Sequence, residues 1–129
     1  MNLVDSSGWM EYFANGSQAN FFKKPIEEVK NLLVPSICIY EVFKKTLQFC
    51  DEKKALEIVA IMRMGKVVPL DDQMAFSAAS ISHKLKLPMA DSIILATAQE
   101  HNAIIWTQDA DFKDLPGVNY VAKTHSRKE

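Results

Sequence analysis

Five short apolar runs, separated by longer segments of helical period, constrain the fold of this 129-residue chain more than any other feature. Apolar runs that do not alternate with polar residues are typical of strands that are buried on both faces. Strands that alternate with helices predict an α/β sandwich, in which right-handed crossovers connect a mostly parallel sheet and helices cover both of its faces. The five predicted strands cover residues 2–5, 32–35, 66–70, 103–106 and 118–122.

Capping residues and helix breakers mark where the predicted helices begin and end. Serine and aspartate side chains can accept hydrogen bonds from the first free N–H groups of a helix. Gly65 and Asn102 favour helix ends, and Pro25 predicts a new turn or a kink in the helical stretch that opens at Ser17. The predicted N-caps are Ser7, Ser36, Asp51 and Asp71, for helices over 8–14, 37–50, 52–64 and 72–85.

The composition fits one domain over residues 1–129, with a tail that is frayed from about residue 124. A hydrophobic content of 48% is ample for one continuous core at this length. The formal net charge of -1 argues against a protein that grips nucleic acid by charge alone. It does not exclude an enzyme that acts on RNA through metal ions.

The two cysteines and the lack of membrane signals predict a soluble, cytoplasmic protein. Cys38 and Cys50 have neither metal-ligand nor CxxC spacing, so we expect two buried thiols in a reducing cytosol and no disulfide. The sequence carries no basic and then apolar leader pattern, and it has no apolar run long enough to cross a bilayer.

Acidic residues follow two strands that we expect to be neighbours. In a doubly wound sheet of order 3-2-1-4-5, the first and fourth strands lie about 4.8 Å apart, and ligands bind at their carboxyl ends. Asp5 ends the first strand and Asp109 follows the fourth. Both could be turn or capping residues, as could Asp111. However, Ser6 and Ser7 are available to cap the first helix, which would leave Asp5 free for another role.

Two further acids lie on predicted helices. Glu41 could be a solvated residue that pairs with a lysine at i+3 or i+4, but it follows Ile37 by four positions and so lies near the strand-end side of its helix. Asp91 opens a nearly all-apolar helix from about 90 to 101, where its carboxylate could stabilise the helix dipole. We expect this helix to start at the opposite edge of the sheet, so that a bend or an early non-helical turn would be needed to bring Asp91 to the other acids.

If these acids converge, they require a cation. Two like charges about 5 Å apart in an effective dielectric of about 20 repel each other by roughly 3 kcal/mol. Oxygen ligands without His or Cys suit Mg²⁺ or Mn²⁺ rather than Zn²⁺, and such ions commonly serve phosphate chemistry. The histidines are widely separated in sequence, and we expect surface or helix-end positions for His83, His101 and His125.

Four segments spread over nearly the whole chain carry a family pattern. They are "LVDSSGW", "PSICIYEV", "LPMADSIILATAQEHNAIIWTQDADF" and "LPGV", in that order. These segments resemble the PIN-domain ribonucleases, and most closely the VapC toxins of toxin–antitoxin pairs. The resemblance implies an α/β/α sandwich with a five-stranded parallel sheet. It also implies an acidic quartet around Mg²⁺ or Mn²⁺, made of Asp5, Glu41, Asp91 and Asp109.

The same resemblance implies the supporting residues, the reaction and the partners. Ser6 and Thr107 match the family's supporting hydroxyl positions, although many relatives carry threonine where this chain has Ser6. Asp111 matches a position where an acid is common. The implied function is metal-dependent hydrolysis of RNA to 5′-phosphate and 3′-hydroxyl products. The implied partners are the RNA substrate, a cognate antitoxin that blocks the acidic pocket, and a second copy in a homodimer.

Recognition of RNA would depend on few basic residues. Because basic residues do not outnumber acidic ones in this chain, we expect the RNA to be recognised by its shape or at unpaired loops. The candidates for steering the RNA backbone are Lys44, Lys45, Lys84, Lys86 and Lys113.

Two other functions remain open at the level of sequence. One keeps the acidic site but assigns it to DNA or flap cleavage, or to RNA processing rather than toxicity. The other is a non-catalytic interaction module or a receiver-like phosphoacceptor, for which Lys123 after the last strand supplies the expected lysine only loosely.

Overall fold

Five short strands form one sheet in which every neighbouring pair is parallel. The computed structural model describes residues 1–124, so the predicted frayed tail lies almost wholly outside the described residues. The strand order is β3-β2-β1-β4-β5, which confirms the predicted order, and the sheet is entirely rather than mostly parallel. The strands are β1 (Asn2–Val4), β2 (Leu32–Pro35), β3 (Lys66–Val68), β4 (Ile104–Thr107) and β5 (Val118–Tyr120).

The register of β1 against β4 places the ends of the two central strands together. Leu3 pairs with Ile105 and Val4 with Trp106, so the residues that follow β1 and β4 leave the sheet side by side. β3 stops at Val68, although we predicted a strand to residue 70, because Pro69 has no N–H to continue the ladder.

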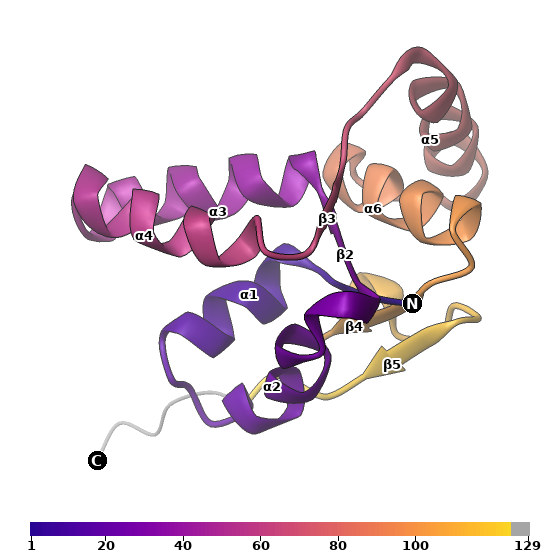
Figure 1. Ribbon diagram of the computed structural model, residues 1–129. Helices are drawn as coiled ribbons and strands as arrows, with labels where there is room; N and C mark the ends of the chain where they lie inside the picture. Colours follow the sequence, from indigo (N-terminus) through magenta and orange to yellow (C-terminus); the bar gives the residue numbers. More distant parts are fainter. Residues whose placement is uncertain (125–129) are drawn as a thin grey trace.

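Residues 1–124 include six α-helices, most of which pack against the sheet. In Figure 1, α1 and α2 lie on one side of the strands, α5 and α6 lie together on the other, and α3 and α4 run side by side away from the sheet. Short 3-10 helices over Val29–Asn31 and Ala110–Phe112 were not predicted. The helices are α1 (Ser6–Phe13), α2 (Ala19–Glu27), α3 (Ser36–Phe49), α4 (Glu52–Met62), α5 (Asp72–Leu85) and α6 (Met89–Glu100).

Two predicted N-caps are wrong. The cap of α1 is Asp5 rather than Ser7, because Asp5 keeps an extended backbone and its carboxylate accepts a hydrogen bond of 2.9 Å from the N–H of Gly8. Ser36 is already the first residue of α3, and Pro35, whose ring fixes φ, occupies the cap without a side-chain bond. Asp5 is therefore not free of a capping role.

Two other N-caps are confirmed, and they supply a contrast with Asp5. Asp51 accepts from the N–H of Lys54 and Asp71 from that of Met74, each at 2.9 Å. Both aspartates are exposed at the start of surface helices. They act as caps alone, whereas Asp5 caps a helix inside the protein.

The core lies between the strands and the apolar faces of the helices. Residues 92–98 of α6 are all buried, as its nearly all-apolar sequence predicted. Trp9 and Phe22 are fully buried, so the aromatic residues of the first two helices contribute to the core. Cys38 is buried as predicted, but Cys50 is exposed at the end of α3, which corrects the prediction of two buried thiols.

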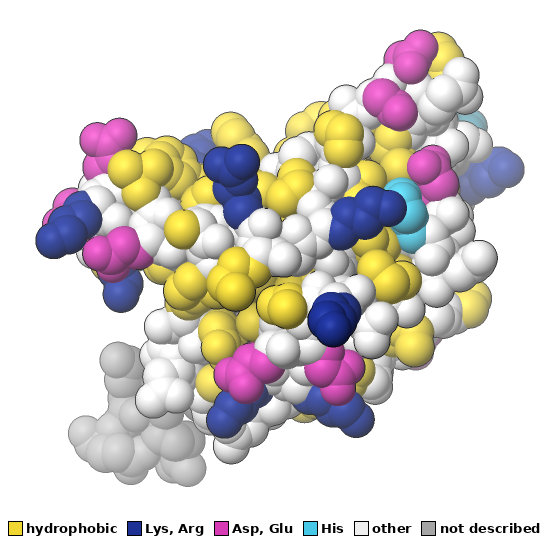
Figure 2. All heavy atoms as spheres, in the orientation of Figure 1, with side chains coloured by type: hydrophobic (Ala, Val, Ile, Leu, Met, Phe, Trp, Pro, Cys, Tyr) yellow, Lys and Arg dark blue, Asp and Glu magenta, His cyan; other side chains and the backbone are white. Residues whose placement is uncertain are grey.

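The surface carries mixed charges. Figure 2 shows basic, acidic and hydrophobic side chains interspersed over one face of the molecule, in keeping with the net charge of -1. Among residues 1–124, no helix has the length and apolar character needed to cross a membrane.

Candidate functional site

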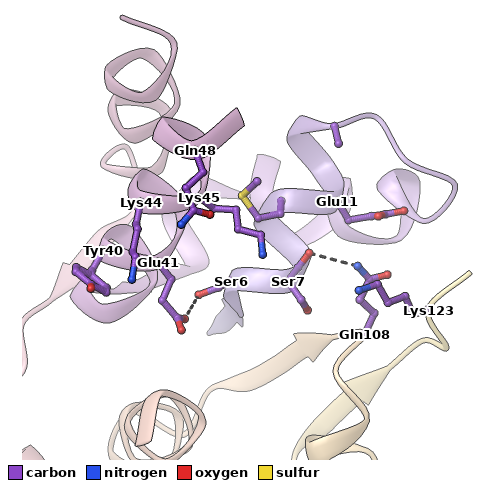
Figure 3. A pocket seen from close by; sticks show the side chains of 12 residues that line it. Ser6, Ser7, Glu11, Tyr40, Glu41, Lys44, Lys45, Gln48, Gln108 and Lys123 are labelled. Carbon is purple, nitrogen blue, oxygen red and sulfur yellow. Dashed lines mark hydrogen bonds between the residues drawn. The ribbon is translucent and has the colours of Figure 1, made fainter. Parts of the chain in front are cut away.

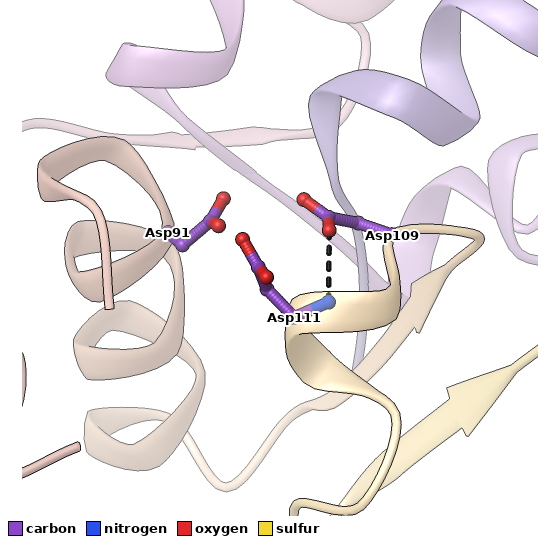
Figure 4. Close-up of side chains that lie close together, drawn as sticks. All are labelled: Asp91, Asp109 and Asp111. Carbon is purple, nitrogen blue, oxygen red and sulfur yellow. Dashed lines mark hydrogen bonds between the residues drawn. The ribbon is translucent and has the colours of Figure 1, made fainter. Parts of the chain in front are cut away.

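Three aspartates meet at the carboxyl edge of the central strands. Asp91 comes from the first turn of α6, Asp109 from the end of β4, and Asp111 from the 3-10 helix that follows. Each offers a carboxylate oxygen, and these oxygens all lie within 4.8 Å of one another (Figure 4). The N–H of Asp111 donates a hydrogen bond of 2.9 Å to Asp109 Oδ1, which fixes the loop that carries both residues.

The position of Asp91 corrects one expectation from the sequence. We expected α6 to start at the opposite edge of the sheet, but it runs antiparallel to the strands. The helix ends beside the amino end of β4, where Asn102 takes a left-handed φ of 51° and the chain turns directly into Ile104. The first turn of α6 therefore lies at the carboxyl edge, and Asp91 reaches the other acids without a bend.

Asp5 forms the buried floor beside this group. It is only 2% exposed, and its oxygens accept hydrogen bonds from the N–H of Gly8, from Ser7 Oγ and from Thr107 Oγ1. Burial raises the pKa of Asp5 to about 6, although these hydrogen bonds oppose the shift, and Asp109 adds to it through charge repulsion. Asp5 is outside the tight group of three acids but close enough to interact with it.

Thr107 connects the floor to the tight group. Its hydroxyl donates to Asp5 Oδ2 at 2.6 Å and accepts from the N–H of Asp109 at 2.8 Å. The side chain is fully buried at the end of β4. Thr107 thus links two of the predicted site residues, Asp5 and Asp109, by hydrogen bonds.

Asp91 experiences the strongest electrostatic penalty in the site. Its pKa is raised to about 8, first by burial and then by the charge of Asp109, by a hydrogen bond and the charge of Asp111, and by the charge of Asp5. The protein alone thus disfavours a full set of ionised carboxylates here. A bound cation would reverse this preference.

Glu41 and Ser6 lie at the rim rather than in the tight group. Glu41 is in the second turn of α3, and its Oε1 accepts a 2.5 Å hydrogen bond from Ser6 Oγ at the start of α1. Both residues line a groove of about 600 Å³ between α1 and α3 (Figure 3). Of the lysines predicted to steer RNA, only Lys44 and Lys45 line this groove.

The buried thiol of Cys38 lies beneath the end of β1, where its Sγ is 3.9 Å from the carbonyl oxygen of Val4. Burial raises its pKa well above the usual range, and nearby charges on Asp5, Glu41 and Asp91 raise it further, against a lowering hydrogen bond from Ser6. Cys38 therefore lies close to acids from β1, α3 and α6. It serves as packing beneath the site and not as a nucleophile, because a thiol with so high a pKa stays protonated.

The tight group suits a hard divalent cation. Mg²⁺ binds oxygen ligands at about 2.0–2.1 Å, so opposite ligands of one ion are about 4.2 Å apart. Neighbouring ligands of the same octahedral ion are closer, about 2.9 Å apart. The oxygens of Asp91, Asp109 and Asp111 lie within 4.8 Å of one another, so their side chains would rotate inward to bind one ion together. No histidine shares the group: His83 is exposed on α5, His101 caps the end of α6, and His125 lies outside the described residues.

Gln108 has a place in the site that the sequence did not predict. It is 5% exposed and lies between Thr107 and Asp109, and its Nε2 donates to the carbonyl of Ser7 at 3.4 Å. Its Oε1 is buried and has no hydrogen-bond partner among the residues that the structure describes. The only sequence signal was its position directly after β4, since burial of one amide oxygen leaves no pattern in a sequence.

Comparison with known proteins decides the family. The PIN domain family model matches residues 3–118, nearly the whole chain. This protein belongs to the PIN-domain family. The predicted resemblance and the predicted fold are thereby confirmed. A comparison with curated protein sequences gives no significant match.

Solved structures share this PIN fold at low sequence identity. A toxin–antitoxin complex from Klebsiella pneumoniae contains a chain of TM-score 0.76 and 23% identity, covering 92% of this chain and 96% of that one. The Mycobacterium tuberculosis toxin VapC20, described as cleaving the sarcin–ricin loop, has a TM-score of 0.75 at 14% identity and covers 90% and 95% of the two chains. VapBC2 from Rickettsia felis, bound to a promoter DNA fragment, has a TM-score of 0.71 at 13% identity, covering 94% and 97%.

Proposed function

We propose that this PIN-domain protein is a metal-dependent endoribonuclease and the toxin of a type II toxin–antitoxin pair. The observation that carries the proposal is the group of Asp91, Asp109 and Asp111 above the buried Asp5. An acidic group on a PIN fold suits hydrolysis of phosphodiester bonds. Structural relatives support the choice of RNA and of a toxin, since one is described as a sarcin–ricin loop cleaving toxin and another as a toxin–antitoxin complex.

We assign the divalent ion, Mg²⁺ or Mn²⁺, to the carboxylates that can reach it. Asp91 and Asp109 would hold it together with Asp111, and Asp5 would contribute charge from below. When bound, such an ion polarises a phosphoryl oxygen and lowers the pKa of water. Asp111 thus joins the quartet that we predicted from the sequence, in which Glu41 was a ligand or the group that orients the attacking water.

The remaining site residues would position the reactants. Glu41 at the rim is free to orient a water and accept its proton, with Ser6 holding its carboxylate by the hydrogen bond between them. Water then attacks phosphorus in line, and the 3′ oxygen leaves and takes up a proton. The products are a 5′-phosphate and a 3′-hydroxyl. Thr107 is a positioning residue, because it acts through Asp5 and Asp109.

The protein partners that we propose are an antitoxin and a second copy of this chain. The support for an antitoxin is the group of structural relatives solved as toxin–antitoxin complexes. Exposed apolar side chains offer a surface for either partner, and on α3, α4 and the turn after α4 they include Leu47, Phe49, Leu56, Ile61 and Met64. A cytoplasmic location follows from this function, since its substrate is there.

Cleavage assays on matched single-stranded RNA and DNA test the proposed function. The intact chain should cleave RNA with Mg²⁺ or Mn²⁺ and should lose activity in EDTA. The Asp91→Asn and Asp109→Asn variants should fold and fail to cleave, whereas Asp114→Asn, an exposed aspartate outside the site, should cleave normally. Full activity of either site variant would defeat the assignment. Cleavage of DNA alone would assign the same site to a DNA nuclease.

A further inference from the structure

The groove between α1 and α3 has no role in the chemistry described so far. At its inner end are Ser6 and Glu41, which belong to the rim of the acidic site. From there the groove runs along both helices and has a volume of about 600 Å³. Gln108 and Lys123 line its other side (Figure 3). A substrate bound at the acids would therefore continue into this groove.

The groove presents three ammonium groups beside an acidic centre. Lys44, Lys45 and Lys123 are all exposed, and all three line it. The lining also holds two carboxylates: Glu11 accepts a hydrogen bond of 2.8 Å from the N–H of Gln18, and Glu41 accepts one from Ser6. The three exposed ammonium groups outnumber them and suit an anionic ligand. Successive phosphates of a nucleic-acid strand are such a ligand.

An exposed aromatic ring lies in the same wall. Tyr40 is 58% exposed on α3, one turn before Lys44, and Lys44 Nζ lies 5.8 Å from the centre of its ring. A tyrosine ring in the open, beside cations, is the combination on which unpaired bases stack. The bases of a duplex are already stacked on one another, so this feature favours a single strand.

Gln108 adds a hydrogen-bond acceptor on the opposite side. It is 95% buried, and its Oε1 has no partner among residues 1–124, although it lines the groove. A buried acceptor without a partner destabilises the protein, unless a ligand or water supplies a donor. A nucleotide has such donors in its 2′-hydroxyl and in the amino groups of its bases.

From these three observations we propose that the groove holds the single-stranded RNA segment next to the cleaved bond. Lys44, Lys45 and Lys123 contact its phosphates, a base stacks on Tyr40, and Gln108 Oε1 accepts a hydrogen bond from the nucleotide. This inference rests on the proposed function, because it extends a strand from the same site. A protein segment in the groove is the competing occupant, and the tests below separate the two.

Salt-dependent binding tests the lysines. The probe is a fluorescein-labelled single-stranded RNA of about 12 nucleotides, within the size that such grooves accommodate. Binding is followed by anisotropy in the full chain with Asp91→Asn, which prevents cleavage. The logarithm of the association constant falls with the logarithm of the salt concentration, and each lost lysine–phosphate contact makes this slope less steep by about 0.7. The Lys44→Ala/Lys45→Ala pair should therefore make it less steep by about 1.4. The control pair Lys23→Ala/Lys24→Ala, exposed on α2 and outside the groove, should not change the slope.

Substitution at Tyr40 tests the stacking. Removal of one stacked base should weaken binding about 5- to 150-fold in Tyr40→Ala. Tyr40→Phe keeps the ring and should bind the RNA as tightly as the parent, which is the Asp91→Asn chain without further substitutions. Because Tyr40 is exposed, both variants should unfold at the same temperature as the parent.

Gln108→Met tests the acceptor and identifies its donor. If the donor is a 2′-hydroxyl, the parent should prefer RNA over DNA of the same sequence, and the variant should lose that preference. If it is a base amino group, the variant should weaken both probes equally. Equal binding of both probes by parent and variant would remove Gln108 from the proposal.

The groove and the nuclease can fail separately. If the intact chain cleaves RNA but the Lys44/Lys45 and Tyr40 variants bind it unchanged, the groove proposal is overturned and the groove is left to a protein segment. If the parent binds RNA through the groove but the intact chain cleaves none, the proposed function fails while the groove stands. If the Asp91→Asn chain binds no RNA and the intact chain cleaves none, both proposals are overturned.

Discussion

The folded protein disfavours the ionised forms of two aspartates at this site, Asp5 and Asp91. Asp5 and Asp91 have pKa values raised to about 6 and about 8 from the ordinary 3.8. A raised pKa means that the folded state favours the protonated form. Protonation of these carboxyl groups therefore stabilises the folded state. This stabilisation is fully present below pH 3.8 and is lost as pH rises through the folded-state pKa values.

In the absence of metal, the chain should therefore become less stable between about pH 4 and pH 8. We expect Asp91→Asn to flatten the upper part of this profile and to be the more stable protein at pH 8, because it removes the carboxyl that titrates there. Thermal unfolding in EDTA across this range measures both curves. A variant that loses stability with pH just as the parent does would show that Asp91 is not under strain.

Thr107 is the second residue whose replacement isolates one interaction. Thr107→Val keeps the shape but leaves a buried Asp5 oxygen without its 2.6 Å donor and the Asp109 N–H without its acceptor. An unsatisfied buried group costs about 1–3 kcal/mol, so the free energy of unfolding should fall by about that amount or more. Thr107→Ser keeps the hydroxyl and should recover most of the loss in denaturant titrations. Equal losses in both variants would mean that the methyl group, and not the hydroxyl, is what matters.

At the level of elements, the site depends on how closely α1 approaches α2 and β1. Gly8 has no room for a side chain, since a Cβ there would lie 2.6 Å from Phe22 Cε1 and 2.7 Å from Val4 Cγ1. Its N–H also donates the 2.9 Å hydrogen bond by which Asp5 caps α1. Overpacking at this point would move the start of α1 away from the acids.

We expect Gly8→Ala to lower the free energy of unfolding by about 1–3 kcal/mol and to reduce activity. Gly16→Ala is the matched control, because the atoms nearest to a Cβ there belong to the Glu11 carboxylate, the far end of a side chain that can move aside by giving up its hydrogen bond from Gln18. Denaturant unfolding of both variants, with cleavage measured in parallel, makes the comparison. If the two substitutions cost the same, the tight contact at Gly8 has no special importance.

The elements also show what the sequence could and could not predict. Alternation of apolar runs and helical segments predicted a mostly parallel sheet, because buried strands that are joined by helical crossovers run in the same direction. The order 3-2-1-4-5 was adopted as one order of a doubly wound sheet and did not follow from the alternation itself. The same pattern misled us about Asp91, since we overlooked that a helix leading into a parallel strand starts at the carboxyl edge. Gln108 could not be found at all, and Asp111 looked like a turn former, because both depend on how the loop after β4 folds back.

For the whole molecule, the fold brings together acids from segments that are far apart in the chain. Asp5 follows β1 and Asp109 comes shortly after β4. Glu41 lies in α3, and Asp91 lies in the first turn of α6. The parallel sheet achieves this because the carboxyl ends of its strands share one edge. The face of the molecule in Figure 2 carries mixed charges, so we attribute substrate binding to the groove and the metal rather than to a uniformly basic face.

The stabilising effect of Mg²⁺ at pH 8, in the intact chain and in Asp91→Asn, tests most directly whether these acids form a cation site. Binding to the folded state alone adds about 2.7 kcal/mol at 100 times the dissociation constant, so the unfolding temperature of the intact chain should rise steadily with Mg²⁺. Asp91→Asn should respond far less, and Asp114→Asn should respond like the intact chain. An intact chain whose unfolding temperature is the same with and without Mg²⁺ and Mn²⁺ would contradict the proposed metal site.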